Sequence, residues 1–262
     1  MKSLKATSQR ITGKDTVGRT IEESKRAQNE FINCDLSSRG DIQYEGNYYH
    51  DYFRALPFAS VRRLLIGLNV TLYGRSVLIA SCGTGIDVHY LRKYYDSDFT
   101  VSDLFKESVQ MTLKLNKNIR GGYVEDNEKL SFGDDSFDYV FIAASLHHLP
   151  RPLIGLYELI RVAKYGVIVI EPNDSWLTRI ATRFKLATEI EEAGNYVYRF
   201  SAWDIKRISQ ALFYKCHYVR LFATHRVAKN KLEFMILKGL NTIANLLMPA
   251  LGNYIVFFIE KD

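Results

Sequence analysis

The stretch SVLIASCGTGIDVHY, residues 76–90, carries the pattern that decides the fold. Its apolar run, Val77–Ala80, is typical of a buried strand and leads directly into the glycine-containing turn Ser81–Gly85. The apolar spacing after this turn indicates a helix that begins at Ile86. Glycines let a turn bend sharply and approach a ligand closely, and a helix N-terminus offers it unpaired N–H groups. The stretch therefore predicts a strand, a ligand-binding loop and a helix in direct succession.

The same alternation of short apolar strands and helices continues to about residue 170, as a parallel sheet covered on both faces requires. The expected strands are Val77–Ala80, Phe99–Val101, Phe137–Ala143, Val167–Ile170, Tyr218–Phe222 and Tyr254–Ile259. The expected helices are Tyr48–Leu68, Ile86–Tyr95, Lys106–Asn116, Leu153–Lys164, Ala202–Phe213 and Lys231–Leu247. We expect an α/β fold: a doubly wound, mostly parallel seven-stranded sheet with helices on both faces, an antiparallel C-terminal strand pair and a helical N-terminal lid.

The remaining segments divide the chain further. Residues 1–40 are polar and are expected to form a flexible tail, and residues 41–74 a helical lid or cap. Residues 75–262 form the expected Rossmann-like domain, with a substrate-cap insertion at about 174–200 and a helical insertion at about 229–248.

Composition narrows the functional classes. The net charge of +6 over 262 residues is a modest excess and does not establish a nucleic-acid binder. The three cysteines form no CxxC pair, which indicates neither a zinc site nor a disulfide framework and fits a reducing, cytoplasmic compartment. The sequence also shows no signal-peptide pattern and no apolar run long enough to span a bilayer, so we expect no stable membrane insertion.

Further polar motifs follow the glycine turn in a recognisable order. Asp103 closes the second expected strand, at the spacing where dinucleotide-binding folds place a ribose-binding acid. The segments DNEKLSF (126–132), DDSFDYV (134–140) and SLHHLP (145–150) come next. In this order of motifs the sequence resembles the class I S-adenosylmethionine-dependent methyltransferases, particularly their small-molecule branch. The resemblance is close from Ser76 to about Asn173 and does not cover the first seventy residues or residues 174–200.

This resemblance implies S-adenosylmethionine as the cofactor and assigns positions to it. Gly83 and Gly85 would pass beneath its methionine part, Asp103 would bind the ribose hydroxyls, Leu104 would flank the adenine, and Asp126 with Asn127 would bind the adenine edge. Ala143 would leave room near the sulfonium. The expected cofactor-binding residues are Ser81, Gly83, Gly85, Asp87, Asp103, Leu104, Asp126, Asn127, Ala143 and, from the tyrosine-rich lid, Tyr48.

Two positions depart from the family pattern. Ile79 stands where the family usually has an acid, and Ser81 where it usually has a glycine. We expect Ser81 to be tolerated through a negative φ angle. We also hypothesise that Asp87, in the first turn of the following helix, replaces the missing acid beside the cofactor's amino group; the alternative is that Asp87 only stabilises the positive helix end.

His147, His148 and Glu171 are the catalytic candidates, because a hydroxyl acceptor must lose a proton during methyl transfer. Adjacent side chains of an extended segment point in opposite directions, so we expect one histidine to face the acceptor, with Glu171 orienting or assisting it. The predicted reaction is methyl transfer to a small-molecule acceptor, at a hydroxyl oxygen, by in-line displacement with a histidine base.

Other functions stay open at this point. An N-methyltransferase would rely on proximity alone, and loss of the acid at Ile79 is compatible with an inactive, methyltransferase-like binding protein. A nicotinamide-dependent oxidoreductase fits less well, because Val88 stands where its third fingerprint glycine belongs. The loop after the expected strand Phe137–Ala143 lacks the D/N/S-P-P-aromatic motif of base methyltransferases, so no nucleic acid is expected as a partner. We expect no metal, and the oligomeric state stays open, a homodimer included.

Overall fold

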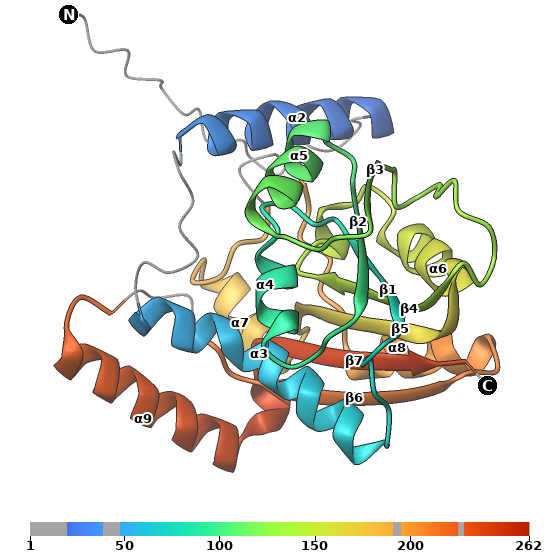
Figure 1. The fold of residues 1–262 in the computed structure, drawn as a ribbon. Coiled ribbons are helices and arrows are strands. Elements are labelled where there is room, and N and C mark those ends of the chain that lie inside the picture. Colours follow the sequence, from blue (N-terminus) through green and yellow to red (C-terminus); the bar gives the residue numbers. More distant parts are fainter. Residues whose placement is uncertain (1–19, 39–47, 191–194, 225–227, 262) are drawn as a thin grey trace, which may run out of the picture.

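The computed structural model describes residues 20–38, 48–190, 195–224 and 228–261. Its centre is a seven-stranded sheet in the order β3-β2-β1-β4-β5-β7-β6, in which β7 is antiparallel to both of its neighbours and the other pairs are parallel (Figure 1). The strands are β1 (Ser76–Ala80), β2 (Asp98–Asp103), β3 (Gly121–Val124), β4 (Phe137–Ala143), β5 (Ala163–Pro172), β6 (Lys215–Leu221) and β7 (Tyr254–Glu260). The predicted fold class is thereby confirmed.

The helices lie on both faces of this sheet. They are α2 (Ile21–Ser38), α3 (Tyr48–Gly67), α4 (Ile86–Arg92), α5 (Lys106–Leu115), α6 (Pro152–Val162), α7 (Trp176–Arg183), α8 (Ala202–Ala211) and α9 (Lys231–Leu247), with short 3-10 turns η1 (Leu146–His148) and η2 (Pro249–Leu251). The insertions expected at about 174–200 and 229–248 contain α7 and α9.

Alternate residues of each central strand enter different cores. In β1, Val77 and Ile79 pack with residues of α3, α4 and α5, whereas Leu78 and Ala80 pack with residues of α6 and α8. This division follows from the two-residue period of a strand, and burial on both faces explains why the central strands are apolar without interruption. Strand β3 was not located from the sequence, because its residues are half-buried or exposed and form no continuous apolar run.

Helix α3 belongs to the core as well as to the expected lid region. Phe58, Val61 and Leu65 are buried in the core on one face of the sheet. The residues before them, Phe53 and Arg54, face a cleft at the carboxyl ends of the parallel strands. The C-terminal part of α3 therefore packs on the sheet, and its N-terminal part covers the cleft.

The polar N-terminal stretch is partly helical, which corrects the expectation of a flexible tail over 1–40. Helix α2 occupies Ile21–Ser38, and residues 1–19 lie outside the described part of the chain. Two polar side chains attach α2 to the domain: Lys25 reaches Asp126, and the Gln28 amide donates to the carbonyl oxygen of His148. The sequence did not reveal this helix, because its first half is polar and the contacts of Lys25 and Gln28 are with groups more than 100 residues away.

Candidate active site

The glycine turn after β1 is held in a conformation that requires glycine. Gly83 has φ 50° and Gly85 has φ 80°, both in the left-handed region. Helix α5 fixes the turn from outside: the Thr112 hydroxyl donates to the carbonyl oxygen of Gly83 at 3.1 Å, and the Asn116 amide donates to that of Gly85 at 3.2 Å. The loop is thus pre-formed before any ligand reaches it.

Asp103 closes β2 directly beside this turn. Its carboxylate accepts hydrogen bonds from the Gly83 N–H at 2.9 Å and the Phe105 N–H at 3.0 Å. Burial raises the pKa of this carboxyl above its usual value, and the backbone N–H donors oppose the rise. Asp103 therefore ties the end of the second strand to the glycine turn, at the position where the sequence predicts a ribose-binding acid.

Ser81 corrects one expectation. Its φ angle is 51°, so the prediction of a negative angle is wrong. Its hydroxyl accepts a hydrogen bond from the Asn127 amide at 2.7 Å, and this contact offsets part of the cost, about 1–2 kcal/mol, of the left-handed backbone. The other amide atom of the buried Asn127, Oδ1, has no hydrogen-bond partner among the residues that the structure describes. A buried acceptor without a partner costs free energy, and a ligand that donates to it would relieve that cost.

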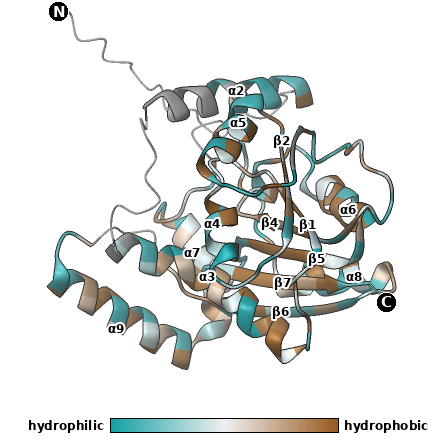
Figure 2. Ribbon diagram, viewed as in Figure 1, coloured by the Kyte–Doolittle hydropathy of each residue, from teal (hydrophilic) through white to brown (hydrophobic). Residues whose placement is uncertain are grey.

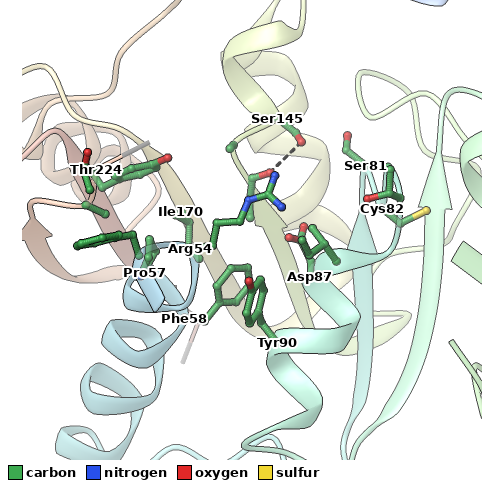
Figure 3. A pocket seen from close by; sticks show the side chains of 18 residues that line it. Arg54, Pro57, Phe58, Ser81, Cys82, Asp87, Tyr90, Ser145, Ile170 and Thr224 are labelled. Carbon is green, nitrogen blue, oxygen red and sulfur yellow. Dashed lines mark hydrogen bonds between the residues drawn. The ribbon is translucent and has the colours of Figure 1, made fainter. Parts of the chain in front are cut away.

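The first cleft, of about 370 Å³, opens between the glycine turn, α3, α4 and the end of β4 (Figure 3). Ser81, Gly83, Asp87 and Ala143, all predicted cofactor contacts, line it. In the view of Figure 3, the Arg54 side chain extends from α3 toward the end of β4, on the side where Asp87 lies. The cleft thus presents one carboxyl group and one guanidinium group to whatever it binds.

Arg54 was not found from the sequence, because a single cation among the aromatic residues of α3 has no local signature. Asp87 sits on the opposite wall, in the first turn of α4, and is 8% exposed. Burial raises the pKa of Asp87 to about 7, and the charge of Arg54 opposes the rise.

Asp87→Asn is expected to stabilise the free protein at alkaline pH. The folded-state pKa of Asp87 is raised, so its contribution to stability is complete below about pH 4 and is lost as the pH rises through about 7. Asparagine stays neutral at every pH, so the variant avoids the cost of burying a charged carboxylate. Its free energy of unfolding at pH 8 should therefore exceed that of the wild type by up to about 4 kcal/mol. Denaturant titrations at pH 4 and pH 8 measure the difference; an equal gain at both pH values would contradict this account.

Asp126 and Asn127 lie in the loop after β3, where α2 covers them. The Lys25 ammonium is 2.5 Å from Asp126 Oδ2 and 3.6 Å from Glu128 Oε2. The Arg151 guanidinium also binds Glu128, whose side chain is fully buried. Lys25 is a further residue that sequence reasoning missed, because 101 residues separate it from Asp126.

His147 and Glu171 form a buried pair. His147 Nδ1 lies 2.6 Å from Glu171 Oε2, and Glu171 Oε1 accepts from the backbone N–H groups of Ser145 and Leu146. Glu171 is fully buried and His147 is 6% exposed. Both carboxylate oxygens are engaged, so Glu171 fixes the orientation of the imidazole ring.

The expectation that adjacent histidines point apart is wrong. Residues Leu146–His148 form a 3-10 turn rather than an extended segment, and the His147 and His148 rings lie 4.1 Å apart between centroids. Both line a second cleft, of about 610 Å³, whose other walls come largely from α7 and the segment that follows it. The two histidines therefore face one space together.

The two clefts meet at a common wall. Ala144 and Tyr254 line both of them. Burial, together with the nearby charge of Glu171, raises the pKa of Tyr254 to about 12, so its hydroxyl stays protonated. Tyr254 begins the last strand, as predicted, but no motif in the sequence marked it as a site residue.

Several predicted cofactor contacts do not line the first cleft: Gly85, Asp103, Leu104, Asp126 and Asn127. Leu104 follows Asp103 and is half-buried. Tyr48 begins α3, and its side chain lies outside the described part of the structure.

The part of the chain that contains this geometry is similar to known proteins. Residues 78–170 match the family model described as a methyltransferase domain. This segment resembles a methyltransferase domain. It contains β1 to β5 apart from the outer ends of β1 and β5, and with them the glycine turn, Asp103, Asn127 and the histidine pair.

Curated relatives match the methyltransferase domain rather than the whole chain. The 2-methyl-6-phytyl-1,4-hydroquinone methyltransferase of Synechocystis sp. (strain PCC 6803) is 31% identical over 106 residues, which is 40% of this chain and 33% of that protein. The phthiotriol/phenolphthiotriol dimycocerosates methyltransferase of Mycobacterium tuberculosis is 33% identical over 99 residues, 37% of each chain. The match thus spans about a third of the length of these relatives.

A solved structure extends the likeness to the whole fold. The crystal structure of magnesium protoporphyrin IX methyltransferase from Synechocystis PCC 6803 with bound SAH superposes with a TM-score of 0.62. It covers 91% of this chain and 100% of the other, at 14% sequence identity. The matched segment and the flanking strands β6 and β7 therefore share the fold of that solved structure.

Proposed function

We propose that this protein transfers a methyl group from S-adenosylmethionine to a hydroxyl oxygen of a small molecule. The observation that carries the proposal is the junction of the two clefts at Ala144 and Tyr254. One cleft has the glycine turn as its wall, and the other has the pair of His147 and Glu171. An activated group held in the first cleft and an acceptor held in the second would meet at this shared wall.

The residues of the first cleft fit the methionine part of the cofactor. An amino acid carries an ammonium and a carboxylate group, and the cleft offers Asp87 and Arg54 to them. The position where the family usually has an acid cannot share this role, because it holds Ile79, a fully buried core residue. This arrangement supports the hypothesis that Asp87 takes over the function of the acid that the family usually has there.

The residues beside the glycine turn fit the adenosine part. Asp103 retains lone pairs for ribose hydroxyls while it holds the Gly83 and Phe105 N–H groups. The partnerless Oδ1 of Asn127 suits an exocyclic amino donor, and Asp126 lies beside it with its charge balanced by Lys25. When bound, S-adenosylmethionine supplies a methyl group already activated on a sulfonium centre.

His147 is the proposed base for the acceptor hydroxyl. Glu171 contacts Nδ1, and in the neutral tautomer that carries its proton on Nδ1 the basic ring nitrogen is Nε2. Tyr254 stays protonated and is placed to orient an acceptor at the wall between the clefts. The relatives matched by the domain are named for methylation of organic small molecules, which supports an acceptor of that kind.

Calorimetry tests the cofactor assignment. The full chain is titrated with S-adenosylmethionine and S-adenosylhomocysteine, and with NAD as the competing dinucleotide. We expect both adenosyl ligands to bind in the micromolar range, about 8 kcal/mol of binding free energy, and NAD to give no heat. Binding of NAD without binding of S-adenosylhomocysteine would favour the oxidoreductase alternative and exclude the proposal.

A further inference from the structure

Helix α9 turns its apolar side away from the protein. The exposed apolar residues recur at three- and four-residue spacing along one side of the helix, and each is more than half exposed. They are Leu232, Met235, Ile236, Leu240, Ile243, Leu246 and Leu247. Figure 2 shows hydrophobic colour along α9, which lies at the outer edge of the molecule. We call this set the α9 face.

The opposite side of the same helix packs on the domain. Phe234 is buried beside Phe53, and the Asn245 side chain exchanges hydrogen bonds with the backbone N–H and carbonyl groups of Phe222. The Lys238 ammonium lies 4.8 Å from the centre of the Tyr52 ring. A helix on a protein in water normally turns most of its large apolar residues inward, whereas most of those of α9 face outward. This exposed side therefore indicates an apolar environment outside the protein.

The α9 face leads toward the second cleft. The turn η2 follows α9 and contacts both α9 and α7, and its residue Leu251 lines that cleft. Helix α7 and the residues after it expose further large apolar side chains, namely Trp176, Ile180, Phe184 and Leu186. Leu177 and Leu186 also line the second cleft. An apolar surface thus extends from α9 to the mouth of the cleft that contains the histidines.

Cations border this surface. Lys229 and Lys231 are exposed at the start of α9, and Arg183 and Lys185 are exposed at the end of α7. Behind α9, Arg63 and Arg220 line a groove with Asn241 and Asn245. A second copy of the chain on this face would bring these like charges together, which costs free energy. An apolar face with a basic border is instead the composition that binds an anionic lipid surface.

We propose that the α9 face and α7 lie on a bilayer containing anionic phospholipid, and that the second cleft takes a lipid-soluble acceptor from it. Within the part of the chain that the structure describes, no helix is long and apolar enough to cross a bilayer, so the attachment is peripheral. The lipid contact rests on α9 itself, whereas the acceptor class rests on the proposed methyl transfer.

Vesicle flotation of the full chain tests the contact. We expect the protein to float with vesicles of phosphatidylcholine and phosphatidylglycerol, less with phosphatidylcholine alone, and less as salt is raised. The double variant Leu240→Gln/Ile243→Gln should lower partitioning about tenfold or more, because two apolar side chains leave the lipid contact. Lys229→Gln and Lys231→Gln should each weaken binding about fivefold, only where phosphatidylglycerol is present.

A matched control is Phe213→Gln, which replaces a large apolar residue that is 90% exposed. Phe213 follows α8, and Figure 1 shows α8 and α9 at opposite ends of the sheet. This variant should float like the wild type. An equal loss of flotation in this control would indicate non-specific adsorption of exposed apolar residues to the vesicles and would overturn the proposal.

Three further results would also overturn it: no flotation of the wild type, unchanged flotation of the double variant, or a solution dimer that the double substitution dissociates. The last would assign the α9 face to a second copy. Titration with S-adenosylhomocysteine separates this proposal from the proposed function. Flotation without nucleoside binding retains the lipid contact and excludes methyl transfer, whereas nucleoside binding without flotation excludes only the lipid contact.

Discussion

Asp103→Ala is expected to lower the affinity for S-adenosylhomocysteine about 100-fold, or about 2.7 kcal/mol. The carboxylate both supports the cleft and is proposed to bind the ribose hydroxyls. Its loss leaves the buried N–H groups of Gly83 and Phe105 without an acceptor, so the glycine turn loses its anchor to β2. Calorimetric titration measures the affinity, and a thermal melt measures the accompanying loss of stability.

Two variants make this result interpretable. Asp103→Asn keeps the shape of the side chain but removes the charge, so it should still weaken binding while it disturbs the fold less. Asp98→Asn changes an exposed carboxylate at the other end of the same strand, beside Arg120, and should leave the affinity unchanged. If Asp103→Asn binds S-adenosylhomocysteine as tightly as the wild type, Asp103 has a structural role only.

His147→Ala is expected to lower the rate of methyl transfer by about 10²–10⁴ and to leave the affinity for S-adenosylhomocysteine intact. Glu171→Gln should lower the rate too, because the amide does not stabilise a protonated imidazole as a carboxylate does. The measurement is transfer of labelled methyl groups to small-molecule hydroxyl acceptors.

A second histidine–glutamate pair provides the control. His217 Nε2 lies 2.9 Å from Glu260 Oε2 across β6 and β7, and neither residue lines the two clefts. His217→Ala removes the same kind of contact and should retain full turnover. Undiminished turnover in His147→Ala would show that proximity alone drives the reaction, as expected for an amine acceptor.

The strands and the glycine turn could be predicted because their signals are local. Strand β4 and helix α9 have the predicted bounds, Phe137–Ala143 and Lys231–Leu247. Burial on both faces leaves a continuous apolar run in the central strands, and a turn with positive φ angles at Gly83 and Gly85 selects glycine. Strand β3 and helix α2 could not be located, because one is an exposed edge strand and the other docks through polar contacts.

The candidate site was predictable only as a set of residue types. The sequence places Asp103 beside the glycine turn, since parallel strands end at one edge of a sheet. It does not give the left-handed backbone of Ser81, which depends on Asn127 46 residues away. The direction of the two histidines was wrong for a related reason: the loop after β4 tightens into a 3-10 turn where Glu171 accepts from two backbone N–H groups.

By itself, the sequence determined the sheet, the loop that begins α4 and the carboxylates at the strand ends, since chain order and apolar periodicity act over short distances. Only the tertiary structure decided which distant groups meet: Arg54 with the first cleft, Lys25 with Asp126, and His147, rather than His148, with the predicted Glu171. It also decided which side of α9 faces outward. Periodicity shows that a helix has two unlike sides, but the side that packs inward depends on the partners that the rest of the chain supplies.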